Sequence, residues 1–135
     1  MASAMTERSG LDRPNPHLNG WSTNDVVRLL LSLAEELQNL DAELSGLERD
    51  AVTKAEQLNV AQAKALLTAT GKTVGEREAQ ALLATEAERL AARLAEINVK
   101  ATKRRVETLR MRIDIGRTVC ATLRSETELE RSSWR

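Results

Sequence analysis

The stretch KATKRRVETLRMRIDIGRTVCATLR, residues 100–124, carries two helical patterns at once. Apolar or small side chains recur at alternating steps of four and three residues, which is the spacing of a coiled-coil seam. This seam consists of Thr102, Val106, Leu109, Ile113, Gly116, Cys120 and Leu123. Basic side chains recur every seven residues directly beside it, at Lys103, Arg110, Arg117 and Arg124. One helix is therefore expected to offer an apolar stripe to a partner helix and a cationic stripe next to it.

Composition favours long helices over a thick globular core. The chain of 135 residues suits one domain, has no Phe and no Tyr, and carries a formal net charge of +0. Aromatic side chains bury the largest areas, and a chain dominated by Ala, Leu, Glu, Arg and Lys is typical of coiled coils. Zero net charge excludes a whole-protein field toward nucleic acid or acidic membranes. The charges are segregated instead: residues 35–50 are mainly acidic and residues 100–124 mainly basic.

A second heptad seam predicts the first helix, over residues 22–69. Ser22 is expected to cap this helix, with Asp25 at the third helical position and Trp21 packed onto Val26. The seam alternates steps of four and three from Val26 to Ala51 and resumes after Lys54. Its members are Val26, Leu30, Leu33, Leu37, Leu40, Leu44, Leu47, Ala51, Leu58, Ala61 and Ala65.

A turn over 70–73 is expected to lead into a second helix over 74–128. Gly71 should adopt the left-handed C-cap conformation, and Thr73 should form a capping box with Glu76. The second helix is expected to use a first seam of Leu83, Ala87, Leu90, Leu94, Ile97 and Ala101, and then to slip by one residue near Lys103. The turn sequence Gly-Lys-Thr is not a phosphate-binding loop, because that motif needs a glycine at position 66, where Leu66 stands, and a preceding strand.

These patterns predict an all-α fold, a long antiparallel two-helix coiled-coil hairpin over residues 21–128. Residues 1–20 are expected to form a disordered arm and residues 129–135 a frayed tail. A lone hairpin buries one stripe per helix, which seldom offsets the entropy of ordering about 100 residues. Further apolar residues off the seam need a second partner. We therefore expect a homo-oligomer, a ring or a bundle, whose interface contains Val27, Leu29, Leu31, Val52, Val60 and Leu67.

The basic stretch has two interpretations. Antiparallel pairing of residue i with roughly 144 − i brings residues 100–105 opposite the acidic stretch, where their charges can serve the fold. Arg110, Arg112, Arg117 and Arg124 then face uncharged residues, which favours binding of a polyanion unless acids of a neighbouring subunit fill the gap. The candidate nucleic-acid-binding residues are Lys103, Arg104, Arg105, Arg110, Arg112, Arg117 and Arg124. Without Phe or Tyr to stack on bases, such binding would be driven by the backbone.

No motif indicates catalysis, a cofactor or a metal. His17 stands alone, without a second ligand at metal-binding spacing, and Cys120 lies in the seam, where a small buried hydrophobe is expected. No nucleophile is paired with a base, so the chain is not expected to be an enzyme. No signal peptide or apolar stretch of about 20 residues is present. We therefore expect a cytoplasmic protein with no membrane partner, in the host cytoplasm if it is phage-encoded.

From roughly Leu44 to Glu126 the layout resembles the UvsY-type recombination mediators of bacteriophages. The resemblance is carried by LERDAVTKAEQLNVAQAKALL, the break TGKTVGEREA, and a long second helix ending LRMRIDIGRTVCATLRSE. It implies a ring-like oligomer that binds single-stranded DNA and helps to load a RecA-like recombinase onto strands coated by single-strand-binding protein. It also implies DNA contacts near the turn from Lys54, Lys64, Lys72 and Arg77.

The expected function is therefore a non-enzymatic accessory role in DNA recombination or replication. A structural coiled-coil scaffold or virion assembly chaperone, with no nucleic-acid binding, is the first alternative; its charges would only set the register between helices. A second alternative is an adaptor that presents Trp134 in its tail to another protein.

Overall fold

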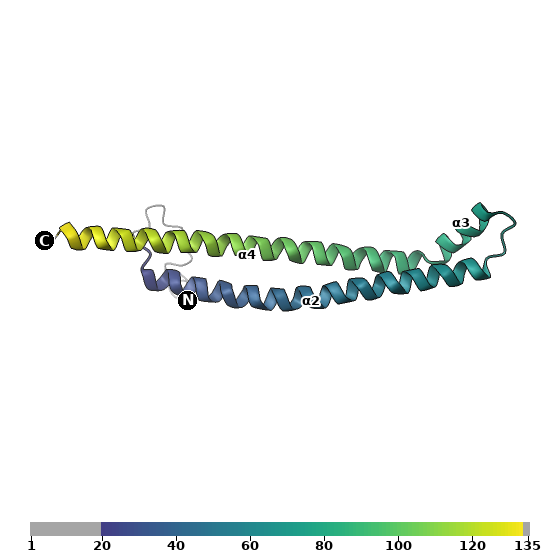
Figure 1. Ribbon diagram of the computed structural model, residues 1–135, viewed down its shortest axis with the longest axis horizontal. Helices are drawn as coiled ribbons and strands as arrows, with labels where there is room; N and C mark the ends of the chain where they lie inside the picture. The colour runs from purple at the N-terminus through teal and green to yellow at the C-terminus, as the bar shows by residue number, and fades with distance from the viewer. Residues whose placement is uncertain (1–19, 134–135) are drawn as a thin grey trace, which may run out of the picture. The chain divides into compact units, whose positions relative to one another are not determined.

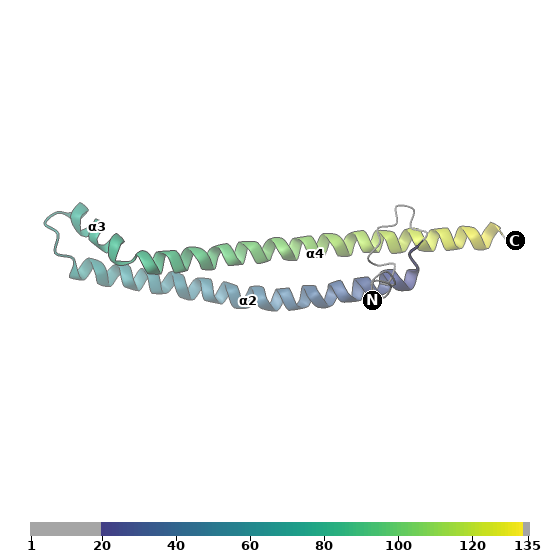
Figure 2. The ribbon, with the colours of Figure 1, turned by 180° about the vertical axis from the view of Figure 1, so that it is seen from behind.

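The computed structural model describes residues 20–133, and nearly all of them are helical. Three helices follow in order, α2 over Thr23–Thr68, α3 over Val74–Ala84 and α4 over Glu86–Ser133 (Figure 1). No strand occurs among these residues, which confirms the expected all-α class. The two long helices pack together, as the views from both sides show (Figure 2). The predicted arm over 1–20, with His17, lies outside the described residues except for Gly20.

The contacts divide the chain into two compact units. Unit 1 is Met1–Asn39 with Glu107–Arg135, and unit 2 is Leu40–Val106. Each unit therefore contains a segment of α2 and a segment of α4, and each is described below by itself.

Helix α2 begins with a reciprocal cap. The Ser22 hydroxyl accepts a hydrogen bond from the Asp25 N–H at 3.1 Å, and the Asp25 carboxylate accepts one from the Ser22 N–H, also at 3.1 Å. These bonds satisfy two N–H groups that have no partner within the helix. Trp21 packs against the cluster that contains Val26. The pKa of Asp25 lies below its ordinary value. The main cause is the hydrogen bond from the Ser22 N–H, and the Ser22 hydroxyl and the positive charge of Arg28 contribute less.

Along α2 the buried and half-buried side chains follow the predicted seam. Val26, Leu33 and Leu40 are buried, and the intervening seam positions as far as Ala65 are half-buried. Lys54 occupies a half-buried seam position, so a charged residue interrupts the apolar stripe in unit 2. The alternation of four and three residues therefore predicts this face of α2 correctly.

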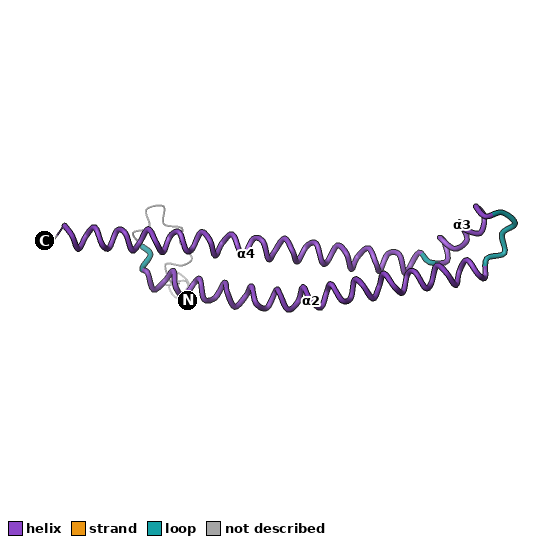
Figure 3. The backbone as a smooth tube through the Cα atoms, in the orientation of Figure 1, coloured by secondary structure: helices purple, strands orange, loops and turns teal. Residues whose placement is uncertain are grey.

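A loop joins α2 to α3 (Figure 3), and side-chain hydrogen bonds tie this loop to α3. Thr73 caps α3 and accepts a hydrogen bond from the Glu76 N–H at 3.1 Å, while Glu76 accepts one from the Lys72 N–H at 2.8 Å. Gln80 accepts hydrogen bonds from the N–H groups of Thr70 and Gly71. The expected left-handed conformation of Gly71 is wrong. Glycine is required there because a Cβ would lie 2.7 Å from the Cβ of Glu76.

The single second helix expected over 74–128 is also wrong, because it breaks at Thr85. Thr85 is buried and donates from both its N–H and its hydroxyl to the Ala81 carbonyl, at 3.1 and 2.8 Å. Beyond the break, the Arg89 guanidinium donates to the Leu82 carbonyl at 2.8 Å. A helix leaves its last carbonyls without intrahelical donors, and here an arginine from the next helix supplies one. No Gly or Pro marks this position, so the sequence pattern gives no warning of the break.

The predicted seam of the second helix is wrong in its first half. Leu83, Leu90, Leu94 and Ile97 are 74%, 58%, 51% and 55% exposed, whereas Ala92 and Ala95 are buried. All buried positions of α3 and α4 keep one phase without a slip, and this phase consists of Ala81, Thr85, Glu88, Ala92, Ala95, Val99, Thr102, Val106, Leu109, Ile113, Gly116, Cys120 and Leu123. Small side chains on this phase allow close approach of a neighbouring backbone, and a single phase avoids the local unwinding that a slip would impose.

In unit 1 the core is a cluster of three buried residues, Val26, Cys120 and Leu123. One turn further along α2, Leu30 lies against Gly116 of α4, where an added Cβ would be only 2.6 Å from Leu30 Cδ2. Cys120 is a free thiol buried among apolar side chains, as its seam position predicts. Helix α4 continues to Ser133, beyond the end expected at residue 128, and Trp134 of the expected tail over 129–135 lies outside the described residues.

The Ser22–Asp25 cap predicts a pH dependence. The folded-state pKa of Asp25 lies below its ordinary value of 3.8. The ionised Asp25 carboxylate therefore contributes its full stabilisation at pH values above 3.8, and this contribution is lost as the pH falls through the lower folded-state pKa. Thermal unfolding of the native protein and of Asp25→Asn, followed by circular dichroism at decreasing pH, should therefore converge at acidic pH. A difference in melting temperature that stays constant with pH would contradict this assignment.

Two glycines of the long helices should respond differently to alanine. Gly46 has no atom within 4 Å of an added Cβ, so Gly46→Ala should raise the free energy of unfolding by about 0.5–1 kcal/mol through helix propensity. Gly116→Ala gains the same propensity but pushes against Leu30, and overpacking costs about 1–3 kcal/mol. We expect Gly116→Ala to be the less stable of the two in chemical unfolding. Equal gains would show that Leu30 does not pack on Gly116.

Candidate nucleic-acid interface

The cationic stripe lies along one edge of the buried seam of α4. Lys103, Arg110, Arg117 and Arg124 each follow directly after a buried seam residue, namely Thr102, Leu109, Gly116 and Leu123. All four basic side chains are exposed. Steps of seven residues correspond to about 10.5 Å along a helix. We call this set the basic edge; Arg110, Arg117 and Arg124 belong to unit 1, and Lys103 belongs to unit 2.

The other predicted basic residues lie elsewhere on α4. Arg105 and Arg112 precede the seam residues Val106 and Ile113, which places them on the opposite edge of the seam from the basic edge. Arg104 is exposed and its Nε donates to the Lys100 carbonyl at 3.5 Å. The seven residues predicted as one DNA-binding set therefore do not form one surface.

Acidic residues alternate with the basic edge on the same helix. Glu107 and Asp114 stand three or four residues from Arg110, and Asp114 is three residues before Arg117. Within residues 20–133, none of the side chains of the arginines at 110, 117 and 124 forms a hydrogen bond or an ion pair. Their guanidinium groups are thus available to a ligand, although the neighbouring acids reduce the local positive potential.

The four basic residues implied near the turn do not form one cluster. Lys54 is half-buried in the seam of α2, and Lys64 lines a shallow cleft of about 630 Å³ with Val52, Val60 and Glu88. Lys72 is exposed, and its N–H is bound to Glu76. The Nε of Arg77 donates to the Thr73 carbonyl at 3.5 Å, so its side chain follows the start of α3.

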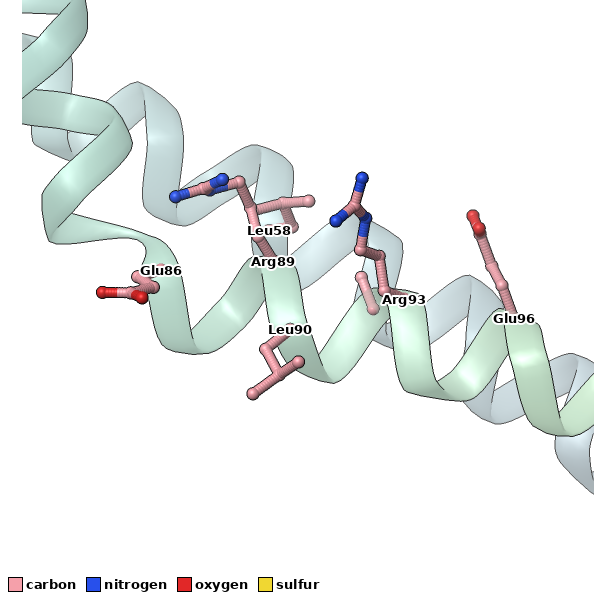
Figure 4. A pocket seen from close by; sticks show the side chains of 7 residues that line it. Leu58, Glu86, Arg89, Leu90, Arg93 and Glu96 are labelled. Carbon is pink, nitrogen blue, oxygen red and sulfur yellow. The ribbon is translucent and has the colours of Figure 1, made fainter.

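Sequence reasoning missed a polar group at the α3–α4 break. Arg89 lines a cleft of about 420 Å³ in unit 2, together with Leu58, Glu86, Leu90, Ala92, Arg93 and Glu96 (Figure 4). The Nε of Arg89 and one carboxylate oxygen of Glu88 are buried without a hydrogen-bond partner among the described residues. Glu88 occupies a seam position. A charged residue within the seam is the sequence feature that could have indicated a polar group here. The phase itself was assigned incorrectly in this part of the chain.

The residues predicted for an oligomer interface are largely exposed. Val27, Leu31, Val52, Val60 and Leu67 are exposed to between 40% and 87%, whereas Leu29 is half-buried. Sequence reasoning missed Leu90, Leu94 and Ile97, because it placed them inside the seam between the helices. Exposed apolar residues therefore occur on both long helices of unit 2.

Residues 20–133 contain no group of three His, Cys, Asp or Glu side chains that could hold a metal ion. Over the same residues, no helix is long and apolar enough to cross a membrane.

Comparison with known proteins adds no assignment to this geometry. No protein-family model, curated protein or solved structure matches the chain.

Proposed function

We propose that this chain is a non-enzymatic accessory protein of DNA recombination or replication that binds single-stranded DNA as a homo-oligomer. Helping to load a RecA-like recombinase is the role that its resemblance to UvsY-type mediators suggests. The observation that carries the DNA-binding proposal is the basic edge, because its arginines are exposed at regular spacing and have no partner within residues 20–133. Repeated cationic contacts supply the sequence-independent part of nucleic-acid affinity.

The proposed architecture is an antiparallel hairpin of α2 and α4. Two contacts of unit 1 support it: Val26 packs with Cys120, and Leu30, four residues later in α2, packs on Gly116, four residues earlier in α4. In both pairs the residue numbers sum to 146. An antiparallel coiled coil also brings corresponding edges of its two seams together.

This pairing separates the basic residues by their neighbours. On the basic edge, Arg110 is expected beside Ala34 and Arg117 beside Val27, so no acid of α2 neutralises them. On the opposite edge, Arg105 and Arg112 are expected beside Glu43 and Glu36, which follow the same spacing before the seam of α2. Lys103 is expected beside Asp41. Arg110, Arg117 and Arg124 are therefore the strongest candidates for phosphate contacts.

Exposed apolar side chains support the proposed homo-oligomer. Leu67, for example, is 87% exposed. Covering such a side chain with a partner lowers the free energy of association by about 25 cal/mol for each Å² of apolar surface buried. Because residues on both long helices are involved, subunits that cover one another are the simplest way to bury them. The interface proposed on α2 consists of Val27, Leu29, Leu31, Val52, Val60 and Leu67.

A structural scaffold without nucleic-acid binding is the second candidate. It is favoured by the alternation of Glu107 and Asp114 with the arginines of the basic edge, because alternating charges are typical of solvated coiled-coil surfaces. The scaffold needs no ligand for these arginines, so oligonucleotide binding separates the two proposals.

Replacing Arg110, Arg117 and Arg124 together by alanine should greatly weaken binding to a labelled single-stranded oligonucleotide. Each phosphate contact on a single strand contributes about 0.7 to the salt slope of the binding constant, so losing three contacts should flatten the slope by about 2. Fluorescence anisotropy over a range of salt concentrations measures both quantities. Alanine preserves the helix, which circular dichroism verifies.

The matched control changes Arg104, Arg105 and Arg112 together to alanine. This variant loses the same charge but keeps the basic edge, so it should retain the native salt slope. If both triple variants bind as the native protein does, or if the native protein does not bind the oligonucleotide, the scaffold is the better proposal.

A further inference from the structure

Helix α4 carries a second apolar stripe in unit 2, which we call the outer stripe. Its members are Ala87, Leu90, Leu94 and Ile97, spaced by three, four and three residues as in a coiled-coil seam. Leu90, Leu94 and Ile97 are each more than half exposed, although Ala92 and Ala95 on the inner side of the same helix are buried. The larger apolar side chains of this segment thus face outward.

We propose that the outer stripe binds the outer stripe of a second copy of this chain, with the two α4 helices antiparallel about a two-fold axis. This inference rests on the homo-oligomer of the proposed function and names one of its contacts. A face that meets itself forms a closed, isologous contact.

The order of large and small side chains fits this self-pairing. When facing residues have numbers that sum to 184, Leu90 lies opposite Leu94 of the second copy, and Ala87 lies opposite Ile97 of the second copy. The two-fold axis repeats both layers, so four layers contain only apolar side chains. The two central layers pair leucine with leucine, and in the two outer layers the small Ala87 faces the larger Ile97, so no layer places a polar side chain in the contact.

The flanking charges are compatible with this register. Glu86, Arg93 and Lys100 follow one another at steps of seven along one border of the outer stripe, and corresponding borders meet in an antiparallel pair. With the sum of 184, Glu86 lies near Lys100 of the second copy, and this favourable pair occurs twice. Arg93 meets its own copy once, at the axis, with Glu96 three residues away on its own helix.

Neighbouring registers are less favourable. A shift of one heptad to a sum of 191 brings Arg93 near Lys100 of the second copy, twice, and like charges at such positions repel. A shift to 177 places Ile97 opposite Gln80, a polar residue of α3 beyond the break. At 177 Glu86 would lie near Arg93 of the second copy, so the apolar layers, not the charges, favour 184 over that register. Charges and apolar layers together point to a second copy in one defined register.

The first test measures subunit number by native mass spectrometry and sedimentation. Leu94→Glu places two carboxylates inside the contact and should halve the mass of the assembly. Met111→Glu is the matched control, because Met111 is a 63% exposed residue of the same helix in unit 1, outside the contact; it should leave the mass unchanged. An unchanged mass for Leu94→Glu overturns the inference.

The second test reads the register with a short thiol-reactive crosslinker in a Cys120→Ala background. Arg93→Cys should crosslink to its own copy at the axis, whereas Lys100→Cys alone should not. A mixture of Glu86→Cys and Lys100→Cys proteins should crosslink to each other. Crosslinking of Lys100→Cys to itself, or none by Arg93→Cys, overturns the proposed contact.

Charge reversal gives an independent result. Glu86→Lys should weaken the assembly by placing lysine near Lys100 of the second copy, and Glu86→Lys with Lys100→Glu should restore it.

Oligonucleotide binding by the basic edge is measured separately. If Leu94→Glu leaves the mass unchanged while DNA binding persists, only the contact fails; if native protein assembles as expected but binds no oligonucleotide, only the DNA proposal fails.

Discussion

Apolar contact between the two long helices is confined to one stripe on each, and the rest of the structure depends on that constraint. With no Phe or Tyr in the chain and Trp21 at the start of α2, packing along the helices relies on leucine, valine and alanine repeated at heptad spacing. In unit 1 this stripe includes Val26, Cys120 and Leu123. In unit 2 it is weaker, because alanine and threonine replace leucine on α4 and Lys54 interrupts α2. Stability in such a chain accumulates along its length.

How far the sequence predicts this fold depends on how distinct each stripe is. On α2 the leucines at seam positions have few apolar competitors at heptad spacing, and the predicted phase is correct. On α4 two phases compete between residues 87 and 102, and the bulkier one, with Leu90, Leu94 and Ile97, was assigned to the seam. The buried phase uses Ala92 and Ala95 instead. Hydrophobicity ranks leucine above alanine, but close packing of helices can favour the smaller side chain.

The break at Thr85 was beyond sequence reasoning for a different reason. It is formed by a buried threonine and by an arginine seven residues after the carbonyl that it caps, and neither residue is a helix breaker by propensity. The basic edge, in contrast, was visible as a seven-residue repeat. That Arg105 and Arg112 lie on the other side of the seam from the basic edge follows only from the buried residues of the structure, which define the seam.

The different surfaces of α4 are compatible because a helix distributes them by angle. In unit 1 the arginines of the basic edge lie beside the seam, and in unit 2 the outer stripe lies away from the seam, so neither set of side chains takes part in the buried stripe.

The contact of Leu30 with Gly116 has a consequence for alignment. Heptad repeats are periodic, so two helices can in principle slide past each other by seven residues and still match apolar with apolar. Sliding α4 by one heptad would place Leu109 or Leu123 where Gly116 now admits Leu30 to within 2.6 Å of an added Cβ. Neither leucine leaves room for that approach. The absence of a side chain at Gly116 thus makes one register of the two helices more favourable than the registers shifted by seven residues.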